Sequence, residues 1–215
     1  MLRSLLDNTG FRNYFVDRYA DLINTIFQPS EMHASATEMH DEMLPEMARH
    51  FNRWNGAWGS SWGTFIGRSG NIPEWEDQID SMLLFSDTRI AFARDQIQSQ
   101  FSLTKQVDVT LDAVPAGAGK IKISTVTPET LPWSGVYFDG VPVTITAIAN
   151  PGYEFKYWEA NGNLPLDDSS ESITLNINST DLFKAHFEKL ELGMDVYPNP
   201  FSDMITINYD LPESM

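Results

Sequence analysis

Four histidines are the residues best suited to hold a metal ion, because imidazole nitrogen is a common ligand of Zn²⁺. They are His33, His40, His50 and His186. None of them belongs to an HExxH motif or to an i, i+4 pair, which is the spacing a zinc site on a helix requires. His33 and His40 are seven residues apart, about two helical turns, which is too far for one ion. The spacing therefore predicts exposed helix residues, and no metal ligand is assigned.

Pairs of carboxylates could hold a cation or carry out acid–base chemistry. Asp17 and Asp21 form one such pair, and Asp77 and Asp80 form another. On a helix the members of each pair would share a face. Such pairs most often belong to a solvated surface, and this is the interpretation we favour. Asp167-Asp168 lacks the alternating ligands of a calcium loop.

Three tryptophans, Trp54, Trp58 and Trp62, repeat at every fourth position. A ladder of this kind could stack against sugar rings, although aromatic side chains between helices more often fill a core, which we favour. The sequence contains no GxxxxGK[ST] phosphate loop, no GxGxxG after a strand and no GxSxG motif. It therefore assigns no catalytic, cofactor-binding or metal-binding residue.

The composition excludes several classes of protein. Lys and Arg number 14 against 30 Asp and Glu, so the net charge is -16. An acidic surface repels phosphate backbones and anionic lipid, which argues against nucleic-acid binding. The absence of cysteine excludes disulfides and thiolate chemistry. No apolar run reaches the ~20 residues that span a bilayer, so we expect no membrane insertion.

Residues 1–103 show the periodicity of helices, which must position most of these candidates. Apolar residues recur at helical spacing over 8–27, 30–51 and 73–101. Asn8 or Thr9 could cap the first helix, which Pro29 should end. Pro45 should kink or split the second. The stripes expected to face the core are Met32, Ala36, Met39, Met43, Leu44, Met47, Ala48 and Phe51 in the second helix, and Trp75, Ile79, Met82, Leu83, Ile90, Phe92, Ala93, Ile97 and Phe101 in the third.

Residues 104–190 instead alternate apolar and polar side chains in short runs separated by turn sequences such as Asp139-Gly140 and Asn161-Gly162. This pattern predicts a small antiparallel β sandwich or barrel-like domain. Residues 194–215 contain a turn and one alternating strand. The predicted fold class is α+β in separate domains, a helical bundle fragment over 1–103, a β domain over 104–190 and the start of a third region over 194–215.

The helical half carries a recognisable pattern in residues 5–15 and 19–24, in Pro45-Glu46-Met47 with His50 and Trp54, and in the third helix with Arg89 and Arg94. This pattern resembles the C-terminal helical part of the CotH family of spore-coat-like protein kinases. The resemblance implies an atypical kinase that phosphorylates Ser/Thr on exported proteins. The ATP- and metal-binding residues of that family would precede Met1, so we transfer no catalytic residue to this chain.

The β half carries Gly119-Lys120-Ile121, Tyr137-Phe138-Asp139-Gly140, Gly152-Tyr153-Glu154-Phe155 with Trp158, and a closing run at 183–187. These residues resemble a divergent internalin-type B repeat, also called a bacterial repeat domain. The resemblance implies a β module that spaces or presents surface proteins and is not an enzyme. Because Phe155 and Trp158 are three residues apart, we expect a strand bend or bulge to bury both.

Near the end of the sequence, Val196-Tyr197-Pro198-Asn199-Pro200-Phe201 precedes Ile205-Thr206-Ile207. This run is similar to the opening of the C-terminal sorting domain of the type IX (Por) secretion system. It implies export across a Gram-negative outer membrane, with release or attachment at the cell surface, and the secretion machinery as a partner. The rest of that domain is not in this sequence.

The sequence therefore predicts a non-catalytic C-terminal fragment of an exported CotH-like kinase, serving as scaffold, spacer and secretion tag. The fragment itself would bind no cofactor, and ATP and Mg would belong to the parent. Its partners would be N-terminal kinase segments absent from this sequence. The alternative is a cell-surface structural or carbohydrate- or protein-binding module whose parent has no kinase activity.

Overall fold

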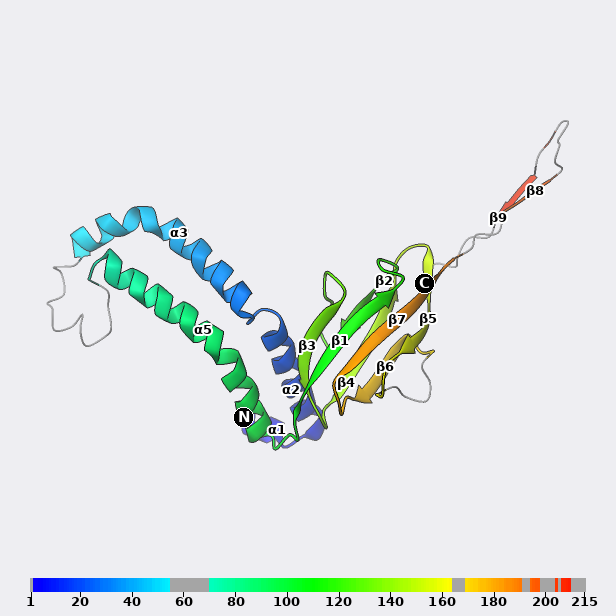
Figure 1. Cartoon of the computed structure of the whole chain (residues 1–215), viewed down its shortest axis with the longest axis horizontal. Coiled ribbons are helices and arrows are strands. Elements are labelled where there is room, and N and C mark those ends of the chain that lie inside the picture. Colours follow the sequence, from blue (N-terminus) through cyan, green and yellow to red (C-terminus); the bar gives the residue numbers. More distant parts are fainter. Residues whose placement is uncertain are drawn as a thin grey trace. The chain divides into compact units, whose positions relative to one another are not determined.

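The computed structural model describes residues 2–54, 70–163, 169–190, 194–197, 204 and 206–209. The chain divides into two compact units. The first comprises Met1–Gln106 with Val136–Val141, and the second comprises Val107–Gly135 with Pro142–Met215. Helices make up most of the first unit and strands make up the second (Figure 1), which confirms the predicted α+β class. The sequence did not indicate that a segment from the β half, Val136–Val141, belongs to the helical unit.

The helices of the first unit are α1 (Leu2–Leu6), α2 (Thr9–Asn24), α3 (Pro29–Trp54) and α5 (Ile72–Gln100). Of the two predicted caps, Asn8 and Thr9, Asn8 caps α2, since its Oδ1 accepts from the Phe11 amide at 3.0 Å. Asn71 caps α5 in the same way, accepting from the Glu74 amide at 2.9 Å. Pro29 opens α3 rather than ending α2, as suits a residue that donates no amide hydrogen bond.

Helices α3 and α5 lie side by side (Figure 1). α3 runs through Pro45 without a break and its axis bends, so the proline kinks the helix and does not split it. The His40 ring stacks on Trp75 with centroids 4.8 Å apart. Nearer the start of α3, His33 Nε2 lies 3.0 Å from Asp87 Oδ1. These pairs fix which side of each helix faces the other.

The core of the helical unit is smaller than the apolar stripes predict. No described residue of α3 is buried, and Met39 is 59% exposed. On α5, Met82 and Phe92 were expected in the core but are 45% and 61% exposed. The reason is geometric, because one neighbouring helix covers a narrow seam and cannot cover an apolar stripe wider than about 100°. The buried apolar residues of this unit are Val16, Ala20, Ile23, Ala93, Ile97, Tyr137, Phe138 and Val141.

Among its described residues, the β half contains seven strands in two sheets. They are β1 (Gln106–Val114), β2 (Gly119–Ile123), β3 (Trp133–Phe138), β4 (Pro142–Ala149), β5 (Tyr153–Glu159), β6 (Ser172–Asn176) and β7 (Asp181–Lys189). One sheet has the order β3-β1-β7-β5 and the other has the order β2-β4-β6. In the described residues these sheets are open and form no closed barrel.

One strand pairing departs from the antiparallel arrangement that we predicted. β1 and β7 pair in parallel, with Leu111 opposite Phe183. The pairs β2–β4, β4–β6 and β5–β7 are antiparallel. Alternating apolar residues are compatible with either direction, and a parallel pair needs only a long connection, which the five strands between β1 and β7 provide.

The predicted bulge near Trp158 is present. The register of β5 against β7 shifts between Phe155 and Tyr157. The shift lets both aromatic rings turn to one side, and the Phe155 and Trp158 centroids lie 5.4 Å apart. Trp158 is 1% exposed and its indole N–H donates to the Ser170 carbonyl at 3.0 Å. The bulge therefore places the largest core side chain of this unit.

Asp181 organises the turn that the sequence predicted at Asn161-Gly162. Its carboxylate accepts from the amides of Asn161 at 2.8 Å, Gly162 at 3.1 Å and Asn163 at 3.0 Å. Burial acts to raise the pKa of Asp181, but these hydrogen bonds outweigh it and the pKa is lowered. The carboxylate thus closes a structural loop at the start of β7.

Near the end of the chain, β8 (Met194–Tyr197) pairs antiparallel with β9 (Thr206–Tyr209). The sequence predicted the second of these strands and not the first. The Pro198–Phe201 part of the sorting-like run lies outside the described residues, as do Trp58, Trp62 and Asp167-Asp168. Trp54, the last residue of α3, is 47% exposed.

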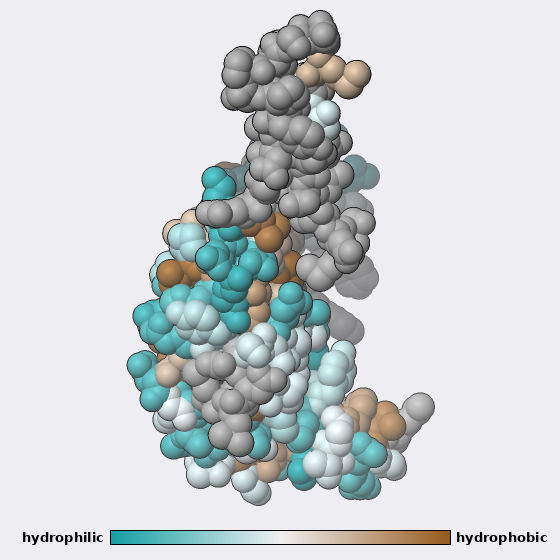
Figure 2. All heavy atoms as spheres, turned by 90° about the vertical axis from the view of Figure 1, so that its right-hand side faces the viewer, coloured by the Kyte–Doolittle hydropathy of each residue, from teal (hydrophilic) through white to brown (hydrophobic). Residues whose placement is uncertain are grey.

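Among the coloured residues on the face shown in Figure 2, hydrophilic and neutral ones predominate, and hydrophobic residues occur in small groups. This distribution agrees with strands that alternate between buried and exposed side chains, such as β2 and β4. Within the described part of the chain, no helix is both long enough and apolar enough to span a membrane.

Gly119 tests the packing of the β unit. It is buried, and a Cβ at this position would overlap the Phe187 ring. We expect Gly119→Ala to lower the free energy of unfolding by about 1–3 kcal/mol, because the ring must move within a close-packed core. Gly162→Ala is the matched control, since a Cβ there meets nothing within 4 Å. Thermal unfolding followed by circular dichroism measures both variants, and equal stabilities would contradict this packing.

Candidate functional site: a buried carboxylate and tyrosine cluster

A group of polar residues lies inside the helical unit, and we call Asp17, Asp21, Asn24, Arg94 and Tyr137 the Asp21–Tyr137 cluster. Asp21, Asn24 and Tyr137 are buried, whereas Asp17 and Arg94 are half-buried. Asp21 and Tyr137 are each 0% exposed. The Tyr137 hydroxyl donates to Asp21 Oδ1 at 2.9 Å. A buried hydrogen bond to a carboxylate is worth more than a neutral one, and it is costly to break.

Asn24, at the last position of α2, binds the main chain of Val136 on both sides. Its Nδ2 donates to the Val136 carbonyl at 2.8 Å, and its Oδ1 accepts from the Val136 amide at 3.0 Å. Arg94 Nη2 donates to the same Oδ1 at 3.0 Å. The Asn24 side chain therefore makes both hydrogen bonds to the Val136 backbone that a neighbouring strand would otherwise make. Through these bonds and the bond from Arg94, it joins α2 and α5 to the Val136–Val141 segment.

The electrostatics of the cluster follow from burial. Burial, and then the charge of Asp21, raise the pKa of Asp17 to about 7. Burial and the Asp21 charge also raise the pKa of the Tyr137 phenol, so this hydroxyl stays protonated and acts as a donor. A carboxyl with a pKa near neutrality is the kind of group that enzymes use as an acid or base.

The surroundings of the cluster do not suit catalysis. The hydroxyl and carboxylate that could react are turned toward each other, and Asp21 has no exposed surface. No group of three or more metal-ligating side chains occurs among the described residues. The prediction that Asp17 and Asp21 lie on a solvated face is wrong for Asp21, which points inward. Asp77 and Asp80 are exposed, as predicted.

The histidines lie apart from the cluster. His33 and His40 serve contacts between helices, whereas His186 lies on strand β7 with a side chain 20% exposed, so the prediction of an exposed helix residue is wrong for it. His40 has a side chain only 16% exposed, so the prediction of an exposed residue is wrong there. Its Nδ1 lies 2.9 Å from Asp41 Oδ1 and its Nε2 lies 3.0 Å from Glu76 Oε2. These hydrogen bonds raise the pKa of His40. His33 is half-buried in the same seam, whereas His50 is exposed as predicted.

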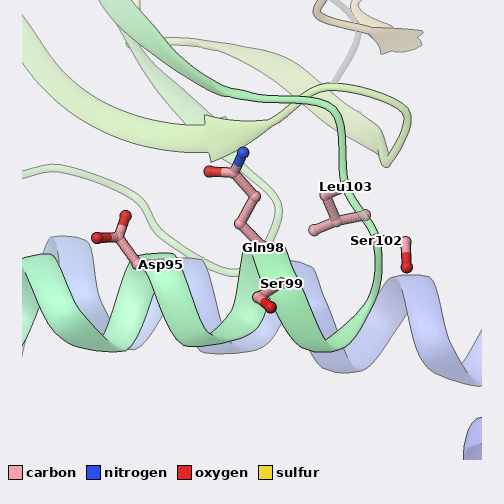
Figure 3. A pocket seen from close by; sticks show the side chains of 5 residues that line it. All are labelled: Asp95, Gln98, Ser99, Ser102 and Leu103. Carbon is pink, nitrogen blue, oxygen red and sulfur yellow. The ribbon is translucent and has the colours of Figure 1, made fainter.

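A cavity of about 430 Å³ lies at the end of α5 (Figure 3). Asp95, Gln98 and Ser99 line it from the helix, with Ser102 and Leu103 from the segment that follows. Ser99 points away from Gln98 and the side chains do not converge on one point. Gln106 Nε2 donates to Asp95 Oδ1 at 2.9 Å and to Gln98 Oε1 at 3.1 Å. The polar groups therefore hold the chain as it leaves the helix.

A second cavity, of about 280 Å³, lies in the β unit between the β1–β2 turn and the loop before β3. Its charged lining residues are Asp112, Lys120 and Glu129. Lys120 and Glu129 are exposed and Asp112 is only half-buried. These charges are solvated, so the cavity lacks the desolvated ionisable group that marks an active site.

Comparison with known families supports two of the three resemblances. Residues 1–93 match the family model described as CotH kinase protein, and residues 109–191 match the one described as divergent InlB B-repeat domain. Each match covers less than half of the 215 residues. No match supports the resemblance to the type IX sorting domain. Searches of curated proteins and of solved structures found no significant similarity.

Sequence reasoning found Asp17 and Asp21 but missed Tyr137 and Asn24, their partners in the cluster. Tyr137 lies 116 residues from Asp21, and no local spacing relates the two. The available signal was Asp21 itself, because it stands between the apolar residues Ala20 and Leu22 in the sequence of the helix. A charged residue in that position requires a partner when the helix packs.

Tyr137→Phe tests the central hydrogen bond. The variant keeps the ring but leaves the buried Asp21 carboxylate with one donor fewer, so we expect the free energy of unfolding of the helical unit to fall by about 1–3 kcal/mol. Tyr157→Phe is the control, because Tyr157 is 44% exposed and should change stability by less than about 0.5 kcal/mol. Chemical denaturation followed by helical circular dichroism measures both, and an unchanged Tyr137→Phe protein would contradict the structure.

Asp17 gives the helical unit a pH dependence of defined sign. Its folded pKa of about 7 lies above the ordinary 3.8, so the folded chain binds more protons between these values. This contribution to stability is complete below pH 3.8 and is lost as the pH rises through 7. One pKa unit corresponds to about 1.4 kcal/mol, so the free energy of unfolding of the parent protein should decline by a few kcal/mol as the pH rises. We expect Asp17→Asn to remove this decline.

The measurement is the free energy of unfolding between pH 4.5 and 8, where Asp17→Asn should be more stable than the parent at pH 8 and nearly equal to it at the low end. Asp80→Asn removes a carboxylate from an exposed site and serves as the control for net charge. The range below about pH 6 isolates Asp17 from the titration of His40. A parent protein whose stability rises steadily from pH 4.5 to 7 would exclude the raised pKa.

Proposed function

We propose that this chain is a non-catalytic structural part of an exported CotH-like protein kinase. The helical unit would serve as scaffold, the β unit as spacer, and residues 194–215 as part of a secretion signal. The family matches over residues 1–93 and 109–191 support the first two roles. The resemblance of residues 196–201 to a type IX sorting domain is the support for export across a Gram-negative outer membrane and for display or release at the cell surface.

The proposal rests mainly on the structural role of the Asp21 carboxylate in the region that matches the CotH family. Asp21, buried and bonded to Tyr137, holds the helices to the Val136–Val141 segment. Such a group contributes to folding and is closed to a nucleotide. ATP and Mg²⁺ would be bound by kinase segments outside this sequence, and those segments would be the partners of the helical unit.

A second candidate function is supported by the outer face of the β5–β7 pair. Tyr157 and His186 stack there with centroids 4.4 Å apart, and Tyr157 is 44% exposed. Glu159 bonds both His186 at 2.8 Å and Lys184 at 2.9 Å. An exposed aromatic ring beside charged hydrogen-bonding groups can bind a sugar or a protein, as expected of a surface-binding module without kinase activity.

The test is isothermal calorimetry with magnesium-ATP on this chain and on a version extended upstream in its reading frame. We expect no binding heat for this chain and binding for the extended one. Saturable binding by this chain alone, lost in Asp17→Asn, would overturn the non-catalytic assignment. Failure of both proteins to bind would reject the kinase parent and leave the surface-binding function.

A further inference from the structure

The ring of His40 meets a carboxylate at each of its two nitrogens, in the seam between α3 and α5. Its Nδ1 lies 2.9 Å from Asp41 Oδ1, and its Nε2 lies 3.1 Å and 3.0 Å from Glu76 Oε1 and Oε2. An ionised carboxylate only accepts hydrogen bonds, so each contact needs a hydrogen on the ring nitrogen. Imidazole carries hydrogens on both nitrogens only when it is charged. The geometry therefore requires the protonated form of His40.

Groups from both helices favour a positive charge on this ring. Among the described residues, the charged groups that contact it are Asp41 on α3 and Glu76 on α5. The indole of Trp75, also on α5, lies against one face of the ring, with centroids 4.8 Å apart and planes 11° apart. A tryptophan face attracts a cation at this distance. The hydrogen bond to Asp41, and then the one to Glu76, raise the pKa of His40.

Loss of the proton leaves contacts that the ring cannot all keep. Neutral imidazole has a single N–H group, so one nitrogen lone pair would face a carboxylate oxygen within 3.1 Å. If the hydrogen stays on Nδ1, the bond to Glu76 across the seam is lost. If it stays on Nε2, that bond has a neutral donor and is weaker than the bond from the charged ring. The attraction between the charged ring and Trp75 ends in both cases, so deprotonation weakens the link between α3 and α5 in either tautomer.

The seam has no buried side chain of α3 to hold it, among the described residues of that helix. A second link across it is made by His33, whose Nε2 lies 3.0 Å from Asp87 Oδ1 and 3.3 Å from the Leu83 carbonyl oxygen. Both acceptors face the same nitrogen, so a neutral ring with its hydrogen on Nε2 satisfies them. The two histidines therefore differ, because His40 needs the charged form and His33 does not. A seam without buried apolar contacts is easily opened when one of its links weakens.

We propose that His40 is a proton-dependent clamp, which holds the outer ends of α3 and α5 together while its ring is charged and lets them separate when the proton is lost. The outer ends are residues 40–54 of α3 and 72–76 of α5. The clamp adds a response to pH that the proposed scaffold function does not require. Because the pKa of His40 is raised above its ordinary 6.5, the clamp is complete below pH 6.5 and is lost as the pH rises through the raised value.

Nuclear magnetic resonance of the histidine ring nitrogens tests the charge on His40. A titration from about pH 5 to about pH 9 gives the protonation midpoint of each ring, and His40→Gln assigns its signals. We expect a midpoint above 6.5 for His40, with both nitrogens protonated below it. Asp41→Asn should lower this midpoint, whereas Asp108→Asn removes an exposed charge from β1 and should leave it unchanged. A midpoint at or below 6.5 in the parent protein would overturn the proposal.

Energy transfer across the seam tests the separation of the helices. The chain has no cysteine, so Ala48→Cys and Gln78→Cys place the only two thiols at exposed positions for a short-range donor and acceptor pair. We expect transfer efficiency to decrease as the pH rises through the His40 midpoint. With His40→Gln added, the efficiency should not change with pH, because glutamine stays neutral. His33→Gln is the matched control and should keep the decrease at the same midpoint.

Three further outcomes would exclude the clamp. One is a constant transfer efficiency across the His40 midpoint, since the ring would then titrate without releasing the helices. Another is an equal decrease in the His40→Gln protein, which would assign the pH dependence to a different group such as Asp17, present in both proteins and with a pKa of about 7. The third is a parallel loss of helical circular dichroism, which would mean that the whole unit unfolds and does not open at the seam.

Discussion

The helical unit depends on the hydrogen bond between Tyr137 and Asp21. Both groups are fully buried, and neither could stay in an apolar interior without the other. The bond attaches the Val136–Val141 segment to α2, and Asn24 adds a second attachment through the Val136 backbone. The apolar core here is small, with alanine and valine at several positions. The polar hydrogen bonds therefore define the position of the segment, which in a larger core would be defined by the packing of apolar side chains. This accounts for a carboxylate in a place where an apolar residue of similar size would be cheaper to bury.

The two ends of the helical unit are built differently. Near α2 the helices bury side chains against Val136–Val141. Toward the tips of α3 and α5 the pair is held by ring stacking and by the interactions of His33 and His40, with no fully buried residue on α3. Local stability should therefore decrease along the pair away from α2, because few buried apolar contacts oppose opening there. A surface of this kind can adjust to a partner at a lower cost than a tightly packed core.

The sequence predicted the class of fold, because helical periodicity and strand alternation are local properties. It predicted the Asn8 cap and the β5 bulge for the same reason, since each follows from a few neighbouring residues. It failed where burial depends on what covers a face. The stripe through Met39 and Met43 has the correct period for a core, but one neighbouring helix leaves it open. It also failed for Tyr137 and for the parallel β1–β7 pair, because both join residues far apart in the chain and no local signal encodes them.

The assignment of Val136–Val141 to the helical unit has a consequence for how this architecture can be inherited or engineered. A unit that is discontinuous in sequence cannot be transplanted by cutting the chain once. Division between Gln106 and Val107 would take Tyr137 away with the strands and leave Asp21 without its hydroxyl donor inside the helices. Recombination that exchanges the β repeat for another would be tolerated only if the incoming repeat brought a tyrosine to the same place. The point where one family match ends and the next begins therefore does not separate two units that fold independently.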